Sequence, residues 1–145
     1  MEGRDSETYV QKACAYLTRP SGELLVFEGP GHDGLQIPKG TVEAGETPRE
    51  AVYREVAEES GLGAFGAVRQ LASDVWRRRE SRWYVRHFFH TVVHESPDRW
   101  THVVTDGGAE HGSEFEFSWI DPAAAEGFAL DLDAYLDLLD PLATA

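Results

Sequence analysis

Residues 40–62 constrain the fold more than any other part of the chain because they mark both ends of a helix; they read GTVEAGETPREAVYREVAEESGL. Thr47 is a residue type that caps a helix N-terminus, and Glu50 completes a T-x-x-E capping box with it. Pro48 suits the first helical position, and Gly61 supplies the left-handed residue that ends a helix. The pattern predicts one well-defined helix.

The predicted helix has an apolar side and an acidic side. A wheel of 100° per residue places four side chains on the apolar side, which is expected to pack: Val52, Tyr53, Val56 and Ala57. Three carboxylates gather on the neighbouring arc: Glu55, Glu58 and Glu59. Like charges one turn apart destabilise a helix, so the acidic arc favours a bound cation; the alternative is a solvated acidic face.

Two glycines, Gly40 and Gly45, bracket a short loop before the helix. Glycine allows a backbone carbonyl to approach a ligand without a Cβ in the way, so this loop can offer a metal a further oxygen. Oxygen donors suit a hard cation such as Mg²⁺ or Mn²⁺, and the same reasoning disfavours zinc.

The same stretch resembles the signature of the Nudix hydrolases, G-x5-E-x7-R-E-U-x-E-E-x-G-U, in which U is a bulky aliphatic residue. Every fixed position is matched, by Gly40, Glu46, Arg54, Glu55, Val56, Glu58, Glu59, Gly61 and Leu62. The resemblance implies a loop-helix-loop that binds a divalent metal and the diphosphate of a nucleoside diphosphate derivative. We call residues 40–62 the box.

The resemblance also implies roles for the box residues. Four metal ligands are expected: the carboxylates of Glu55, Glu58 and Glu59, assisted by the carbonyl of Gly40. Glu46 and Arg54 are expected to form a structural ion pair that fixes the loop against the helix, with no part in catalysis.

The general base is left open between two places in the chain. Glu58 is one candidate, and Glu59 is the box carboxylate whose loss should abolish turnover. Family members also draw a carboxylate from beyond the box, for which Glu114 is the first candidate here, ahead of Glu116 and Glu110.

A basic and aromatic stretch stands out in an acidic chain. The net charge is −13, which argues against bulk nucleic acid as a partner. Six of the 13 basic residues nevertheless fall within 18 positions: Arg69, Arg77, Arg78, Arg79, Arg82 and Arg86. Trp76, Trp83 and Tyr84 are interleaved with them. Solvated arginines on an edge strand and a site for phosphate and base are both open readings.

The expected substrate contacts come from this stretch and from the lead-in to the box. Some Nudix subfamilies place a lysine of a P-K-G lead-in against phosphate, and a lone surface lysine is the alternative. The candidate substrate-binding residues are Lys39, Arg77, Arg79, Arg82 and Trp83.

The remaining pattern predicts a mixed α/β fold. Strands are expected over residues 9–17, 24–27, 35–38, 68–75 and 82–94. Phe115, Phe117 and Trp119 alternate with polar residues and predict a strand with a buried aromatic face. Residues 122–139 predict a C-terminal helix whose inward side chains are Leu132, Tyr135, Leu136 and Leu139. The family resemblance then implies an α/β/α sandwich around a mixed sheet.

Length and composition favour one domain over residues 1–145, since 41% of the residues are apolar. The single cysteine, Cys14, has no internal disulfide partner, so a reducing cytoplasm is expected. The chain carries no 18-residue apolar stretch and no N-terminal leader pattern, so no membrane partner is expected. Relatives that dimerise leave a homodimer open.

The function expected from the resemblance is a divalent-metal-dependent pyrophosphohydrolase in which water attacks phosphorus. Its expected partner is a small nucleotide, with nucleoside triphosphates or dinucleoside polyphosphates placed ahead of ADP-ribose and nucleotide sugars. Two other classes stay open. One is a nucleotide-binding module without turnover, and the other is an isoprenoid diphosphate isomerase, which would need a reactive Cys14.

Overall fold

The structure is a computed structural model and describes residues 6–31, 33–63, 65–105 and 111–139. The elements are β1 (Thr8–Thr18), β2 (Leu24–Glu28), β3 (Lys39–Thr41), α1 (Pro48–Ser60), β4 (Arg69–Arg79), β5 (Arg82–Val92), β6 (Arg99–Val103), β7 (Glu114–Ile120), and the 3₁₀ helices η1 (Pro122–Ala124), η2 (Ala129–Asp131) and η3 (Leu136–Leu139). The predicted α/β class is confirmed.

In the described part of the chain the strands form one mixed sheet in the order β4-β5-β1-β2-β7-β6, and β3 pairs with β1 beside this path. The pairing of β1 with β5 is parallel and the other pairings are antiparallel. The mixed sheet expected from the sequence is therefore confirmed. β1 links the two halves of the sheet, because it is the neighbour of β5, β3 and β2.

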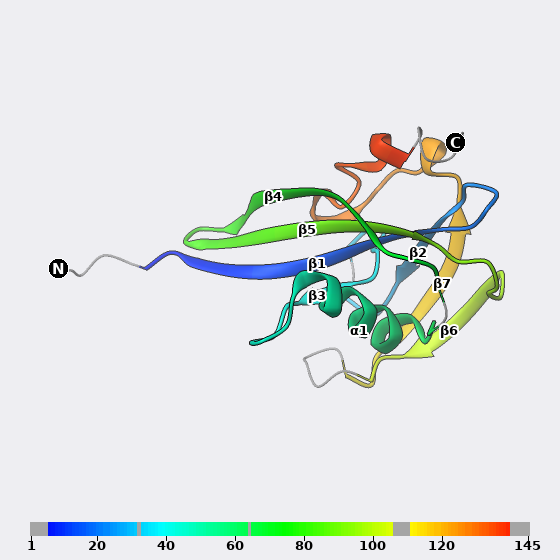
Figure 1. Cartoon of the computed structure of the whole chain (residues 1–145), viewed down its shortest axis with the longest axis horizontal. Coiled ribbons are helices and arrows are strands. Elements are labelled where there is room, and N and C mark those ends of the chain that lie inside the picture. The colour runs from blue at the N-terminus through cyan, green and yellow to red at the C-terminus, as the bar shows by residue number, and fades with distance from the viewer. Residues whose placement is uncertain (1–5, 32, 64, 106–110, 140–145) are drawn as a thin grey trace.

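The sheet lies between α1 on one side and the C-terminal segment, residues 121–139, on the other (Figure 1). Two buried apolar clusters fill these two spaces. The cluster under α1 includes Val52, Val56 and the predicted aromatic face of β7, Phe115, Phe117 and Trp119. The second cluster joins Tyr16 and Phe88 of the sheet to Leu132 and Leu139 of the C-terminal segment.

The strand predicted over residues 35–38 is wrong in place. Leu35 and Gln36 make only single bridges, to Phe128 and Phe27, and the strand is β3, which starts at Lys39. The shift matters because it puts Gly40 into the sheet opposite Ala13 of β1.

The predicted C-terminal α-helix is also wrong, since residues 122–139 form the three short 3₁₀ helices. Leu130 and Asp131 adopt left-handed backbone conformations, with φ of 56° and 54°, which no α-helix accepts. Two side chains from the sheet hold them there: the Arg86 guanidinium donates to the Leu130 carbonyl at 2.7 Å, and the Trp76 indole N–H donates to Asp131 at 2.9 Å. The expected inward packing of Leu132 and Leu139 is confirmed.

Arg86 is the anchor of this arrangement. Its side chain is only 2% exposed and donates through Nε and Nη2 to both oxygens of Asp74, at 2.9 and 2.7 Å. Tyr135 adds a hydrogen bond from its hydroxyl to Asp74 at 2.8 Å. Burial would raise the pKa of the Asp74 carboxyl, but the hydrogen bonds from Arg86 and Tyr135 outweigh it and lower the pKa.

Arg86→Met is expected to destabilise the fold by about 3–5 kcal/mol, because it leaves the Asp74 carboxylate partly buried without its charge partner. Urea unfolding measures the change. The exposed Arg69 at the start of β4 offers a matched control, and Arg69→Met should stay within about 0.5 kcal/mol of wild type. Equal stability of the two variants would contradict the anchoring role of Arg86.

Candidate active site

The box folds locally as its sequence predicts. The Thr47 hydroxyl accepts from the Glu50 N–H at 3.1 Å and the Glu50 carboxylate accepts from the Thr47 N–H at 2.8 Å, which completes the capping box. Gly61 ends α1 in a left-handed conformation, with φ of 82°. Both predicted ends of the helix are confirmed.

The faces of α1 differ from the prediction in one respect. Val52 and Val56 are buried, but Tyr53 and Ala57 are exposed, so the buried apolar face of the helix is narrower than predicted. The carboxylates Glu55 and Glu59 take the buried positions, with 5% and 4% exposure. A solvated acidic face is therefore wrong for these two glutamates. They face the sheet, where β1 and β3 contact the helix.

The Arg54 guanidinium lies at the centre of the acidic residues. It donates to the Glu46 carboxylate through Nε and Nη2, at 2.8 and 2.9 Å, which confirms the predicted pairing. Its Nη1 atom also donates to Glu55 Oε2 at 2.8 Å and to Glu58 Oε1 at 3.1 Å. Nη2 reaches the Thr41 carbonyl at 2.9 Å. One side chain thus joins the loop to the helix and brings two box carboxylates to one cationic point.

Gly40 and Lys39 hold the other side of the box carboxylates. A Cβ built on Gly40 would lie 2.0 Å from the carboxyl carbon of Glu55, so this carboxylate packs directly on the β3 backbone. The Lys39 backbone N–H donates to Glu59 Oε1 at 2.9 Å. β3 therefore positions both buried carboxylates, and any side chain at position 40 would displace the Glu55 carboxylate.

The donor set of the box fits a hard divalent cation in kind. Glu55 and Glu58 converge on the positive Nη1 atom of Arg54, and every donor atom at this point is oxygen. Among the described residues, however, no three His, Cys, Asp or Glu side chains stand close enough together to hold a metal. The Glu59 carboxylate accepts from the Lys39 backbone N–H, and the Arg54 guanidinium lies between Glu55 and Glu58. The predicted ligands Gly40, Glu55, Glu58 and Glu59 stay a prediction.

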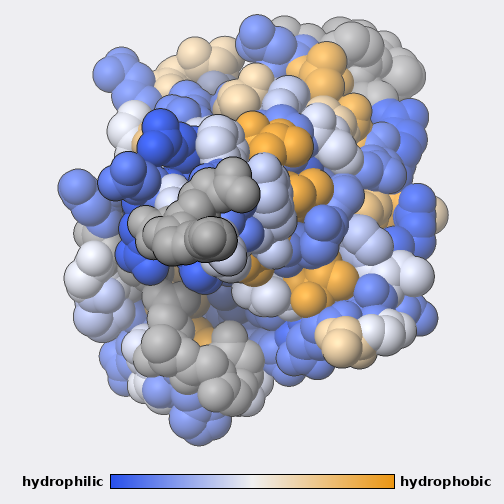
Figure 2. All heavy atoms as spheres, turned by 90° about the vertical axis from the view of Figure 1, so that its left-hand side faces the viewer, coloured by the Kyte–Doolittle hydropathy of each residue, from blue (hydrophilic) through white to orange (hydrophobic). Residues whose placement is uncertain are grey.

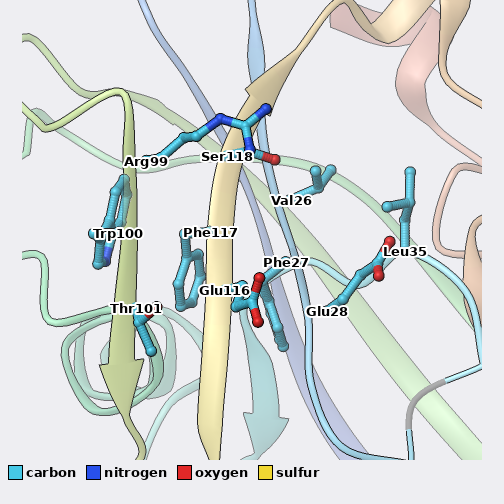
Figure 3. A pocket seen from close by; sticks show the side chains of 10 residues that line it. All are labelled: Val26, Phe27, Glu28, Leu35, Arg99, Trp100, Thr101, Glu116, Phe117 and Ser118. Atoms are coloured by element: carbon cyan, nitrogen blue, oxygen red, sulfur yellow. The ribbon is translucent and has the colours of Figure 1, made fainter.

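The carboxylates predicted beyond the box lie elsewhere. Glu114 and Glu116 line a hollow with Glu28 at the ends of β7 and β2, and no box residue lines it. Glu28 and Glu116 are direct cross-strand partners, as Figure 3 shows from close by. Glu110 lies outside the described residues. The structure thus does not bring Glu114 to the box, and its catalytic role stays a prediction.

A cavity of about 360 Å³ adjoins this hollow (Figure 3). Polar side chains from three strands line it: Glu28 of β2, Glu116 and Ser118 of β7, and Arg99 and Thr101 of β6. These side chains lie on the sheet face opposite α1, since Phe117 and Trp100 between them pack in the α1 cluster.

β4 and β5 form an antiparallel hairpin, and its predicted substrate residues divide between the two faces of the sheet. Arg77 and Trp83 are cross-strand partners, and Tyr9 pairs with Trp83 from β1. Arg79 pairs with Arg82 near the turn. The Arg82 guanidinium lies 6.0 Å from the centre of the Tyr84 ring. Arg82 and Tyr84 both neighbour Trp83 on β5, so their side chains lie on the sheet face opposite Trp83.

Lys12 is a candidate that the sequence argument missed. Its ammonium donates to the Thr41 hydroxyl at 2.9 Å and lies 4.9 Å from the centre of the Tyr84 ring. Burial lowers the pKa of Lys12, Tyr84 raises it, and the nearby Lys39 lowers it further. Two lysines close together at β3 favour an anion there. The available signal was a lysine inside an otherwise apolar strand pattern.

The histidines of β5 have hydrogen-bond partners within the sheet, and Cys14 does not suit an isomerase. His87 hydrogen-bonds to Ser73 and Gln11, and His90 to Thr18, so neither joins a metal cluster in the described chain. Cys14 is fully buried, and burial raises the pKa of its thiol to about 12. A buried thiol of this kind is a poor catalyst for an isomerase.

A family model for the NUDIX domain matches residues 8–139. The chain belongs to the Nudix family. Two curated relatives are both named RNA pyrophosphohydrolase. The protein of Psychrobacter sp. (strain PRwf-1) is 33% identical over 97 residues, which cover 66% of this chain and 56% of that protein. That of Halorhodospira halophila (strain DSM 244 / SL1) is 39% identical over 88 residues, which cover 54% of this chain and 49% of that protein. The chain thus spans about half the length of these relatives.

Solved structures confirm the Nudix fold. A MutT NUDIX hydrolase from Burkholderia pseudomallei superposes with a TM-score of 0.71 at 17% identity, covering 90% of this chain and 98% of that one. The MutT protein from Methanosarcina mazei Go1 gives 0.66 at 20% identity, covering 98% of this chain and 100% of that one. No helix of the described chain is long and apolar enough to cross a membrane.

The relatives correct one expectation. The net charge of −13 was read as excluding bulk nucleic acid, and relatives named for RNA overturn that reading. The physical reason is that net charge sums over the whole surface, whereas a phosphate chain meets only a local patch. The arginines of the β4–β5 hairpin make such a patch inside an acidic protein.

Gly40→Ala is expected to leave the fold intact and to weaken Mg²⁺ or Mn²⁺ binding about tenfold or more. The new Cβ displaces the Glu55 carboxylate, which is the far end of a flexible side chain and can move. Isothermal titration calorimetry gives the affinity. Gly63→Ala is the matched control, because nothing lies within 4 Å of a Cβ there. Equal metal affinity in the two variants would remove Glu55 and Gly40 from the metal site.

The pH dependence of stability tests the Arg54–Glu46 pair. Hydrogen bonds from Arg54 and from the Glu43 N–H lower the pKa of Glu46 from 4.5 to about 2. A carboxyl with a lowered folded pKa adds stability above its unfolded pKa and loses it as the pH falls. Glu46→Gln should therefore flatten the fall in the free energy of unfolding between pH 4.5 and 2. Urea unfolding at several pH values measures it, and an unchanged slope would contradict the pairing.

Proposed function

We propose that this chain is a divalent-metal-dependent pyrophosphohydrolase that removes pyrophosphate from the 5′-triphosphate end of RNA. The names of the curated relatives support RNA as the substrate. The internal linkages of RNA are phosphodiesters, so a phosphoanhydride for such an enzyme exists only at a 5′ end. The observation that carries the proposal is the convergence of Glu55 and Glu58 on the Arg54 Nη1 atom, beside the Gly40 backbone.

The proposed cofactor is Mg²⁺ or Mn²⁺, which the Nudix box and its oxygen donors favour. Glu55, Glu58 and Glu59 and the carbonyl of Gly40 would hold it. When bound, the metal would neutralise the diphosphate and lower the pKa of water. Arg54 would keep its contacts with Glu46 and yield part of its contacts with Glu55 and Glu58 to the metal.

Glu58 is the better placed of the box carboxylates to accept the proton of water. Its side chain is 27% exposed, whereas that of Glu55 is 6% exposed and Glu59 is buried. The hydrogen bond from Arg54 orients the Glu58 carboxylate. A base needs access and orientation before it needs a matched pKa, so Glu58 ranks ahead of Glu114.

Lys12 and Lys39 are proposed to bind the phosphates. They lie close together at β3, and each lysine raises the free energy of the other in the absence of an anion. Lys12 lies with Tyr84 on the sheet face opposite the Glu55 carboxylate, so the phosphates that the lysines contact would lie across β3 from the box.

Free nucleoside triphosphates and dinucleoside polyphosphates carry the same bond and stay alternative substrates. Cytoplasmic location stays a prediction that rests on the single Cys14.

The test is pyrophosphate or phosphate release from 5′-triphosphorylated RNA, nucleoside triphosphates, dinucleoside polyphosphates, ADP-ribose and nucleotide sugars, with Mg²⁺ or Mn²⁺. Glu59→Gln should lower turnover by about 100-fold or more. The fold should stay intact, because the glutamine amide oxygen can still accept from the Lys39 N–H. Glu126→Gln, an exposed site outside the box, is the control.

Two results would count against the proposal. Full activity of Glu59→Gln with an unchanged circular dichroism spectrum would contradict the catalytic role proposed for the box carboxylates. Tight binding of one compound without release from any would instead indicate a binding module.

A further inference from the structure

Three side chains at the outer end of the sheet form a surface that the proposed chemistry does not use. Tyr9 of β1 and Trp83 of β5 stack with their ring centres 6.3 Å apart and their planes 14° from parallel. The Arg77 guanidinium of β4 lies 5.8 Å from the centre of the Trp83 ring. We call Tyr9, Arg77 and Trp83 the hairpin ledge. It offers flat rings and a planar cation side by side.

The ledge lies on the same sheet face as the box carboxylates. Ala13 pairs with Gly40, against which the Glu55 carboxylate packs. Tyr9 precedes Ala13 by four residues, an even number, so both side chains point to the same face. At about 3.3 Å per residue the ledge is roughly 13 Å along β1 from the box. Gln11, hydrogen-bonded to His87 at 2.6 Å, makes the surface between them polar.

This surface stands clear of α1. The strands β1, β4 and β5 extend past the helix toward the turn between β4 and β5 (Figure 1). Tyr9 is 57% exposed and Val75, the neighbour of the ledge on β4, is 58% exposed. The opposite face is different, because Trp76 and Arg86 there are engaged by the C-terminal segment. On the α1 side, the exposed Tyr9 ring and the half-buried Trp83 ring thus lie clear of the helix.

The charge around the ledge is opposite to that of the rest of the molecule. Positions 77–82 hold four arginines and one glutamate in a chain with a net charge of −13. Seen from the hairpin end, the surface is mostly hydrophilic, with apolar patches among the polar side chains (Figure 2). The Trp83 indole donates to the Glu7 carboxylate, which holds the ring in place. Fixed rings beside arginines suit a partner that carries both bases and phosphates.

We propose that the hairpin ledge binds the single-stranded RNA chain that follows the 5′ end in the active site. A base stacks on the exposed Tyr9 ring, which Trp83 supports from β5, and Arg77 contacts the phosphates. The choice of RNA rests on the proposed function. The ledge then favours long substrates over free nucleotides, since an RNA chain offers several bases and phosphates along β1 and a nucleoside triphosphate offers one base.

Fluorescence anisotropy with a labelled, unstructured 12-nucleotide RNA bearing a 5′-hydroxyl tests the ledge without any turnover. Wild type should bind, and the double variant Tyr9→Ala/Arg77→Ala should bind about tenfold or more weakly. Its affinity should also fall less steeply with added salt, because a phosphate contact is gone. Arg69→Ala, an exposed arginine at the far end of β4, is the charge-matched control and should bind as wild type does.

Kinetics separate this inference from the proposed function. The double variant should raise the KM for a 5′-triphosphorylated 12-mer about tenfold more than it raises the KM for a nucleoside triphosphate. Arg77→Glu keeps both rings and should show the same selective rise in the KM for RNA. This single variant tests the ledge even if the double variant fails to fold. If the wild-type protein binds RNA through the ledge but releases no pyrophosphate or phosphate from it, only the proposed function is overturned.

Two outcomes would overturn the ledge. One is equal RNA affinity of wild type and both ledge variants. The other is a wild-type dimer in analytical ultracentrifugation that Tyr9→Ala/Arg77→Ala dissociates, because the occupant of the surface would then be a second copy of the chain.

Discussion

The guanidinium of Arg54 is the interaction on which the site depends. It contacts Glu46 in the loop and Glu55 and Glu58 on the helix, and it reaches the backbone of β3 at Thr41. Without a cation at this point, the carboxylates would repel one another across a few ångströms and the loop would separate from the helix. The acidic arc of α1 is stable because the chain carries its own counter-ion. Under the proposed function, a divalent metal would share these carboxylates with Arg54.

β1 connects this site to the rest of the sheet. Its central residues pair with β3 under the box carboxylates, and its first residues pair with β5 where the hairpin ledge lies. A single continuous strand therefore fixes the spacing between the box carboxylates and the hairpin ledge, so that spacing does not depend on a flexible loop. Arg86 holds the opposite face of the same strands through Asp74 and the Leu130 carbonyl. The hairpin is thus braced on one face and exposed on the other.

The parts of the fold that local chemistry decides could be predicted from the sequence. Thr47, Glu50 and Gly61 specify the ends of α1 through short-range hydrogen bonds, and the Glu46–Arg54 pair follows from the box pattern. The C-terminal helix could not be predicted, because its residues have helical spacing and only the distant Arg86 and Trp76 hold Leu130 and Asp131 in left-handed conformations. The position of Glu59 was missed for a similar reason. Its partner is the Lys39 backbone, and the start of β3 depends on pairing with β1.

The most direct test of the central claim is a Mg²⁺ titration followed by ¹⁵N NMR at the Arg54 Nε–H resonance, assigned by its absence in Arg54→Lys. The account predicts that this resonance moves as Mg²⁺ binds, because Glu55 and Glu58 turn from the guanidinium toward the metal while Glu46 stays. It also predicts that the midpoint of the shift matches the Mg²⁺ dependence of turnover. An Arg54 resonance that stays unchanged at Mg²⁺ concentrations that saturate turnover would contradict the account, because the metal would then bind away from the carboxylates that Arg54 gathers.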